Sequence, residues 1–164
     1  MREQRSETPA SKVPVFALRA ARRKDYAFAL WLYLASARPL LSGLGRWDET
    51  SVVARFAKGY KMREVSIISA DGIEVGWMQV AEFADKFALE QIHLLDAYCG
   101  RGIGSRLLTE LLRRAEAADK GLSLNVMHGN RARRLYERLG LSVVGQDEDK
   151  LHMRSRPEQK PARR

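Results

Sequence analysis

The chain has 164 residues, 45% hydrophobic and 30% charged, which is typical of one globular domain with a sizeable core. It has no run of about 18 apolar residues and a polar N-terminus, so we expect no membrane span or secretory signal and predict a cytoplasmic protein. The net charge of +9 comes from the ends, because residues 25–153 hold seventeen basic and seventeen acidic side chains. A nucleic-acid-binding folded surface is therefore not indicated.

The N-terminal half predicts a tail, a strand, two helices and three more strands. Residues 1–13 are polar and basic and are expected to be disordered. A short strand at 15–19 precedes a helix at 23–37, which Pro39 is expected to end. A second helix begins at Asp48 and ends at Gly59. The strands then run over 65–68, 73–80 and 87–95, with Asp71-Gly72 as a hairpin turn between the first two.

The C-terminal half alternates helices with strands. A helix from Ile103 to about Ala115 has one apolar face, and a strand follows at 122–126. Asn130 is a plausible N-cap for a helix that ends before Gly140. Strands at 141–144 and 150–153 close the domain, and 156–164 form a second basic tail.

The predicted order over residues 14–155 is β-α-α-β-β-β-α-β-α-β-β. A meander that continues into strand-helix-strand indicates an α/β (α+β) fold, with a mixed, mostly antiparallel sheet of about seven strands flanked by about four helices.

A glycine-rich segment lies between the third meander strand and the following helix: Cys99-Gly100-Arg101-Gly102-Ile103-Gly104-Ser105-Arg106. Glycines let the backbone approach a ligand, and free amides at a helix start favour an anion such as pyrophosphate. A tight strand-to-helix turn explains the glycines equally well. A P-loop needs Lys before its Ser or Thr, and a dinucleotide fingerprint needs a sixth-position glycine, where Ser105 stands.

Together with its surroundings, this segment resembles the acetyl-CoA pyrophosphate loop of the GNAT (Gcn5-related) N-acetyltransferases, whose pattern is Gln/Arg-x-x-Gly-x-Gly/Ala. Residues 130–141, Asn-Arg-Ala-Arg-Arg-Leu-Tyr-Glu-Arg-Leu-Gly-Leu, are similar to the family's Asn-x-Ala-x-x-Leu-Tyr-x-x-x-Gly-Phe. The element order matches the family fold over about 14–155. Cys99 replaces the usual Gln/Arg, Asp96 the usual Pro, and Leu141 the usual Phe.

The resemblance implies acetyl-CoA as co-substrate, with no metal. The lone cysteine also excludes a cysteine-cluster zinc site. A backbone amide near Leu94 is expected to polarise the thioester carbonyl, and Asn130 to contact the pantetheine arm. The expected cofactor-binding residues are Leu94, Leu95, Cys99, Gly100, Arg101, Gly102, Ile103, Gly104, Ser105, Arg106, Asn130, Arg133 and Tyr136.

Tyr136 is the expected general acid for the leaving thiolate, with packing on its helix as the alternative role. Glu90 is the candidate base, placed on the strand face shared by Ile92 and Leu94, and a solvated carboxylate is its alternative. His93 is expected to pack on the opposite face, and His128 to follow its strand toward the cleft. His152 is expected to be structural. A nucleophilic Cys99 is a further alternative, although no histidine lies nearby in sequence.

The expected function is acetyl transfer to a primary amine by direct attack in a ternary complex. The acceptor is a small-molecule or peptide amine, and a homodimer is possible in this family. Alternatives are a non-catalytic acyl-CoA-binding module and, on the basic tails, a nucleic-acid-binding protein. Residues 25–100 carry ten acids and seven bases, a mild bias that suits a cationic acceptor. The acceptor-wall candidates on the first two helices and their linker are Trp31, Tyr33, Arg38, Trp47 and Arg55.

Overall fold

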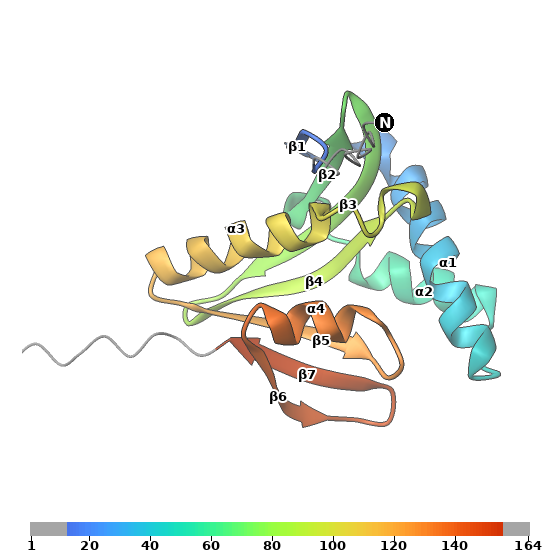
Figure 1. The fold of residues 1–164 in the computed structure, drawn as a ribbon. Helices are drawn as coiled ribbons and strands as arrows, with labels where there is room; N and C mark the ends of the chain where they lie inside the picture. The colour runs from blue at the N-terminus through green and yellow to red at the C-terminus, as the bar shows by residue number, and fades with distance from the viewer. Residues whose placement is uncertain (1–12, 156–164) are drawn as a thin grey trace, which may run out of the picture.

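The computed structural model describes residues 13–155, and the tails expected at 1–13 and 156–164 lie outside this range except for Val13. Two helices follow the first strand, three strands come next, and helices and strands then alternate until the last two strands (Figure 1). The elements are β1 (Phe16–Ala20), α1 (Tyr26–Gly43), α2 (Glu49–Gly59), β2 (Val65–Ala70), β3 (Ile73–Glu82), β4 (Lys86–Leu94), α3 (Ile103–Ala117), β5 (Gly121–Met127), α4 (Ala132–Arg138), β6 (Leu141–Gln146) and β7 (Lys150–Ser155).

The seven strands form one sheet in the order β1-β2-β3-β4-β5-β7-β6. Only β4 and β5 pair in parallel, and every other neighbouring pair is antiparallel. The predicted fold class, element order and mostly antiparallel sheet are therefore confirmed. Asp71 and Gly72 form the predicted turn, with φ of 51° and 81°.

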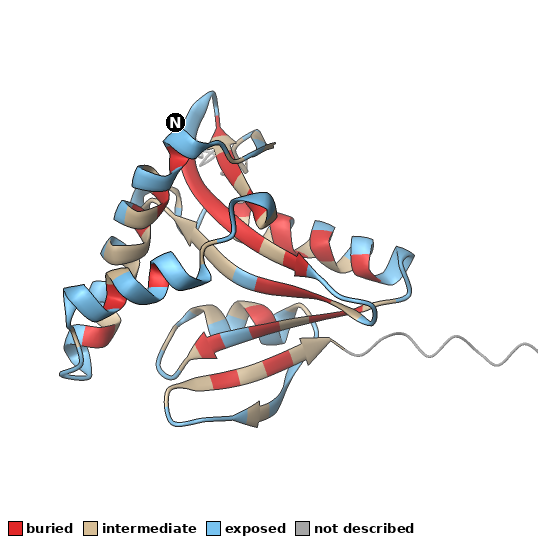
Figure 2. Cartoon of the chain, turned by 180° about the vertical axis from the view of Figure 1, so that it is seen from behind, coloured by how far each residue is buried: buried red, intermediate tan, exposed pale blue. Residues whose placement is uncertain are grey.

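Helices cover the two faces of the sheet, and each face has its own core (Figure 2). On one face, α3 buries its apolar side against the strands through Leu107, Leu108 and Leu111. On the other face, α1 and α2 pack Leu32 and Phe56 against Trp77 of β3. Among the described helices, none has the length and apolar run that a membrane crossing needs.

The prediction that Pro39 ends the first helix is wrong, because α1 continues through Pro39 to Gly43. Proline removes one hydrogen bond to the carbonyl four residues earlier. That carbonyl belongs to Ala35, which is exposed, so water can satisfy it and the helix can continue.

Candidate active site: a split in the sheet beside a glycine loop

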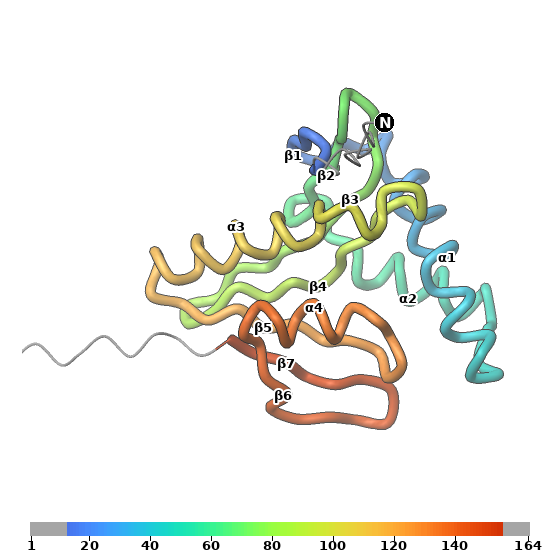
Figure 3. Tube along the Cα trace, in the orientation of Figure 1, coloured from blue at the N-terminus to red at the C-terminus, as the bar shows by residue number. Residues whose placement is uncertain are grey.

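The central feature of the sheet is a separation between β4 and β5. Their parallel pairing joins Lys86–Leu89 to Gly121–Leu124 and then stops. Beyond that point β4 continues to Leu94 and β5 to Met127 without pairing to each other. Figure 3 shows the two strands together at their starts and apart at their C-terminal ends. We call this gap the opening.

A β-bulge at Glu90 begins the separation. Gln79 of β3 faces Gln91 of β4, whereas Val80 faces Leu89, so Glu90 is an extra residue without a partner on β3. Such a bulge bends the strand that carries it. It also corrects the expected placement of Glu90: Ile92 and Leu94 pack against the core on the α3 side, whereas Glu90 lines a groove on the other face.

The opening presents main-chain donors on both of its sides. The Leu95 N–H donates to the Val75 carbonyl of β3 at 2.8 Å, so the alternating amide of Leu94 is directed away from β3. On β5, the His128 N–H donates to Asp149 O at 3.0 Å, which directs the Met127 amide toward the opening. An extended ligand can therefore pair with both strands. Leu95 itself has no spare main-chain group, because its carbonyl accepts from the Tyr98 N–H.

The glycine loop at the end of β4 carries a row of unpaired amides. Gly100 and Gly102 have φ of 71° and 84°, a left-handed conformation that glycine adopts without strain. The first intrahelical bond of α3 runs from the Arg106 N–H to the Gly102 carbonyl. Within residues 13–155, the N–H groups from Gly100 to Ser105 meet no acceptor. The helix dipole adds positive potential at this place, which suits a pyrophosphate.

Cys99 ties this loop to β4. Its Sγ lies 3.7 Å from the Leu94 carbonyl, to which the thiol donates weakly. Burial and the neighbouring Asp96 carboxylate raise the pKa of the Cys99 thiol. A raised pKa keeps the sulfur protonated and disfavours the alternative of a nucleophilic cysteine.

Three arginines surround the start of α3 and α4 with positive charge. Arg101 lies over the ring of Tyr98 at 5.1 Å, and Arg106 over Phe16 at 6.0 Å. Arg133 pairs with Glu137 on the same helix at 2.8 Å.

Two sequence-predicted residues lie in α4 and just before it. The N-cap is Arg131, one residue after the predicted Asn130, but the Asn130 side-chain oxygen accepts from the Ala132 N–H at 3.0 Å and so satisfies one amide of the first turn. Tyr136 is 7% exposed and belongs to the core on the α3 side. Burial raises the pKa of its phenol to about 12, so the hydroxyl stays protonated and can donate a proton.

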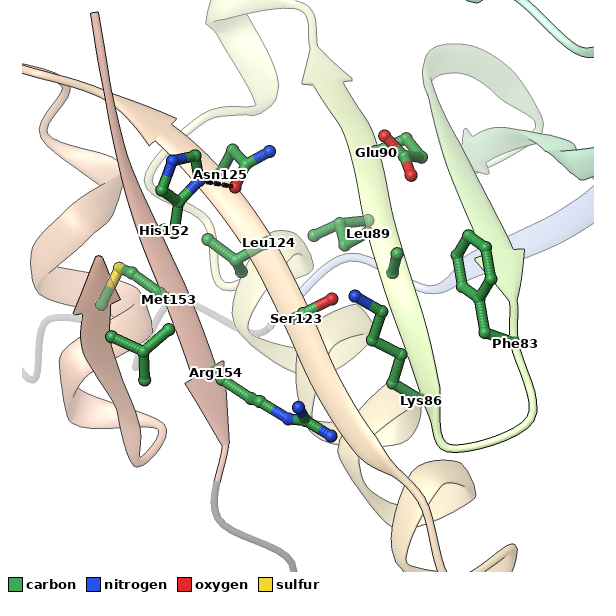
Figure 4. A pocket seen from close by; sticks show the side chains of 12 residues that line it. Phe83, Lys86, Leu89, Glu90, Ser123, Leu124, Asn125, His152, Met153 and Arg154 are labelled. Atoms are coloured by element: carbon green, nitrogen blue, oxygen red, sulfur yellow. Dashed lines mark hydrogen bonds between the residues drawn. The ribbon is translucent and has the colours of Figure 1, made fainter. Parts of the chain in front are cut away.

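Glu90 lines a groove on the face opposite α3, beside β5 and β7 (Figure 4). Asn125 and His152 face each other across these strands, and His152 Nδ1 lies 2.6 Å from Asn125 Oδ1. His152 Nε2 lies 3.2 Å from Asp147 Oδ2. The sequence did not assign Asn125 to the site, since its position beside His152 depends on which strand neighbours β5.

The other candidates are placed as follows. His93 packs between the rings of Tyr33 and Trp77, as expected, with Nε2 2.8 Å from Gln91 Oε1. His128 Nε2 lies 3.1 Å from the Asp147 carbonyl oxygen at the β6–β7 turn. Of the acceptor-wall candidates, Trp31 is exposed and Trp47 holds the Arg38 guanidinium over its ring at 5.6 Å.

Comparison with known proteins agrees with these features. Residues 62–141 match a family model described as Acetyltransferase (GNAT) domain, a range that includes β3, β4, the glycine loop, α3, β5 and α4. No curated protein matches the chain. The predicted resemblance to the GNAT acetyltransferases is confirmed over residues 62–141.

Solved structures with the same fold include two N-acetyltransferases and a complex with a bisubstrate analogue. PaiA N-acetyltransferase from Thermoplasma acidophilum, in complex with coenzyme A, has a TM-score of 0.71 and 17% identity, covering 87% of this chain and 99% of that chain. The ribosomal-protein-S18-alanine N-acetyltransferase from Escherichia coli has a TM-score of 0.63 and 19% identity, covering 90% of this chain and 97% of that chain. Arabidopsis thaliana Naa50, with the bisubstrate analogue CoA-Ac-MVNAL, has a TM-score of 0.60 and 17% identity, covering 86% and 98%. At these identities they establish the fold.

Proposed function

We propose that this GNAT acetyltransferase moves an acetyl group from acetyl-CoA to a primary amine by direct attack, with both substrates bound together. The observation that carries the proposal is the combination of free amides from Gly100 to Ser105 with the opening between β4 and β5. The first binds an anion, and the second binds an extended arm that ends beside Leu94. Acetyl-CoA has both parts and supplies the activated acetyl group.

The acetyl-CoA site is built from main-chain donors with nearby positive charge. The amides of the glycine loop and the start of α3 hold the pyrophosphate, and Arg101 and Arg106 add cationic charge. Asn130 and the free main-chain groups of β4 and β5 contact the arm. Cys99 orders the loop through its contact with the Leu94 carbonyl, in place of a longer polar side chain.

The chemistry uses one amide and two side chains. The Leu94 N–H donates to the thioester carbonyl oxygen, which gains negative charge as the amine attacks. Glu90 accepts the proton that the attacking ammonium must lose, directly or through water. Tyr136 donates its phenolic proton to the departing thiolate. Because Glu90 and Tyr136 belong to opposite faces of the sheet, base and acid reach the reacting carbon from opposite sides.

Acetylation of a panel of amines tests this proposal. The full chain is incubated with acetyl-CoA and with a peptide, an amino acid or a diamine, and mass spectrometry detects the acetylated product. We expect Tyr136→Phe to lower kcat by roughly 100-fold at saturating acetyl-CoA, which is typical of lost acid catalysis. Tyr60→Phe is the matched control, because the Tyr60 hydroxyl is buried without a partner in the described chain.

Unchanged kcat in Tyr136→Phe would remove that residue from the mechanism. Binding of acetyl-CoA without acetylation of any amine would instead favour a non-catalytic binding module.

A further inference from the structure

The groove beside Glu90 has two ends of opposite charge. At the end next to the opening lie Glu90, Asn125 and His152. At the other end lie Lys86 and Arg154, with Ser123 between them and the opening. The pairing places Ala88 beside Ser123 and Ser123 beside Arg154, so small side chains form the floor between the two ends. Four residues of β4 separate Lys86 from Glu90, or about 13 Å along the strand.

Both cations line the groove but point in different directions. Figure 4 shows Lys86 running along β4 toward Ser123, whereas Arg154 extends across β5 toward the start of β4. Lys86 forms no ion pair within residues 13–155, and its ammonium lies 5.5 Å from the centre of the Phe83 ring. Arg154 contacts the exposed Asp85 at 3.3 Å, so part of its charge is balanced from outside the groove.

Gly121 allows Arg154 to take this position. A Cβ at Gly121 would lie 3.1 Å from Arg154 Nε and 3.4 Å from Nη2, so the guanidinium group lies where another residue would place its side chain. Because Gly121 also pairs with Lys86, the missing side chain opens the space between the two cations.

We infer that the acceptor is a small amine that carries a carboxylate at its other end. This inference rests on the proposed function: the amine lies beside Glu90 at the opening, and the carboxylate lies between Lys86 and Arg154. Between these two ends, the exposed Phe83 ring and Val144 methyl groups line the groove walls, where they can contact an apolar chain that joins the amine to the carboxylate. A groove volume of about 330 Å3 suits a small molecule. The far end of the groove would repel a second ammonium.

Three amines on a six-carbon skeleton test the inference: ε-aminocaproate, n-hexylamine and hexamethylenediamine. With saturating acetyl-CoA, we expect kcat/KM for ε-aminocaproate to exceed that for n-hexylamine by about tenfold, the effect of one charge-assisted hydrogen bond. The diamine is expected to be the poorest acceptor of the three.

Variants separate recognition of the carboxylate from a general loss of activity. Lys86→Met and Arg154→Met are each expected to lower kcat/KM for ε-aminocaproate about tenfold. The same variants should change kcat/KM for n-hexylamine by less than about twofold. Gly121→Ala keeps both charges but displaces Arg154, and should raise KM for ε-aminocaproate alone. Arg23→Met, an exposed site beside β1 at the far edge of the sheet, is the matched control.

A diamine that reacts as well as ε-aminocaproate would overturn the inference, as would variants that lower activity on all three amines equally. If none of the three amines is acetylated, the wider amine panel separates the two failures: acetylation of a peptide there overturns this inference alone, whereas no acetylation of any amine overturns the proposed function.

Discussion

At the scale of single residues, burial determines which titratable groups can take part in proton transfer. Tyr136 is buried in the α3-side core, and its pKa of about 12 keeps the phenol protonated at neutral pH. Glu90 is exposed at a bulge, where water and an amine can both reach it. His93, also on β4, is instead enclosed by Tyr33 and Trp77, and burial lowers its pKa to about 4. It is therefore neutral and structural at neutral pH.

His93 gives the protein a specific pH dependence of stability. The unfolded chain binds a proton at His93 below its ordinary pKa of 6.5, whereas the folded chain does so only near 4. The stabilisation is therefore complete above about pH 6.5 and is lost as the pH falls toward about 4. We expect the urea midpoint of His93→Gln to change less with pH over this range than that of the wild type. The urea midpoint of the exposed His128→Gln should change with pH as the wild type's does.

Identical pH profiles for wild type and His93→Gln would contradict this assignment. Asp25, paired with Arg19 at 2.8 Å, does not interfere, because its pKa is lowered to about 2 and its effect appears only below the ordinary value of 3.8.

At the scale of elements, the end of β4 depends on a close approach of β3. Gly76 pairs with Leu94, and a Cβ at Gly76 would lie 2.2 Å from the His93 carbonyl oxygen and 2.8 Å from Leu94 Cδ2. No side chain fits there without moving the two strands apart. The same pairing fixes the position of the Leu94 amide at the opening, so a backbone contact between two strands orients the proposed donor to the thioester.

Gly76→Ala is expected to lower the free energy of unfolding by about 1–3 kcal/mol, the usual cost of overpacking. It should also lower kcat at saturating acetyl-CoA, because the Leu94 amide shifts. Gly59→Ala is the control: no atom lies within 4 Å of its added Cβ, so stability and kcat should stay near the wild-type values. Urea denaturation and acetyl transfer measure both quantities, and a Gly76→Ala protein with wild-type kcat would argue against the role of this strand end.

Local patterns in the sequence predicted the elements better than they predicted interruptions within them. The Asp71-Gly72 turn, the apolar face of α3 and the Asn130 hydrogen bond at the start of α4 each depend on a few neighbouring residues, and all three are observed. Pro39 and Glu90 are exceptions. A proline can be tolerated in a helix where the carbonyl that it leaves unpaired is exposed. A bulge is a shift in register between two strands, and the alternation of apolar and polar residues within one strand does not reveal it.

At the scale of the whole molecule, the sheet order creates the groove. β7 lies between β5 and β6, which brings His152 beside Asn125 and Arg154 beside Ser123. These pairings join residues about 30 positions apart, and no sequence pattern specifies them. The glycine loop and α4 could be predicted from motifs, whereas Asn125, Lys86 and Arg154 join the site only through the fold. In the function we propose, the sheet separates the cofactor from the acceptor, and the two meet at the opening.

Calorimetric titration of the full chain with acetyl-CoA tests the central claim most directly. We expect one site per chain with a dissociation constant in the micromolar range. Gly102→Ala should weaken binding, because φ of +84° is strained for alanine in the glycine loop, whereas Gly72→Ala has a similar φ of +81° in the β2–β3 turn and should bind normally. Absence of binding at high micromolar acetyl-CoA, or equal weakening by both variants, would contradict an acetyl-CoA site at this loop.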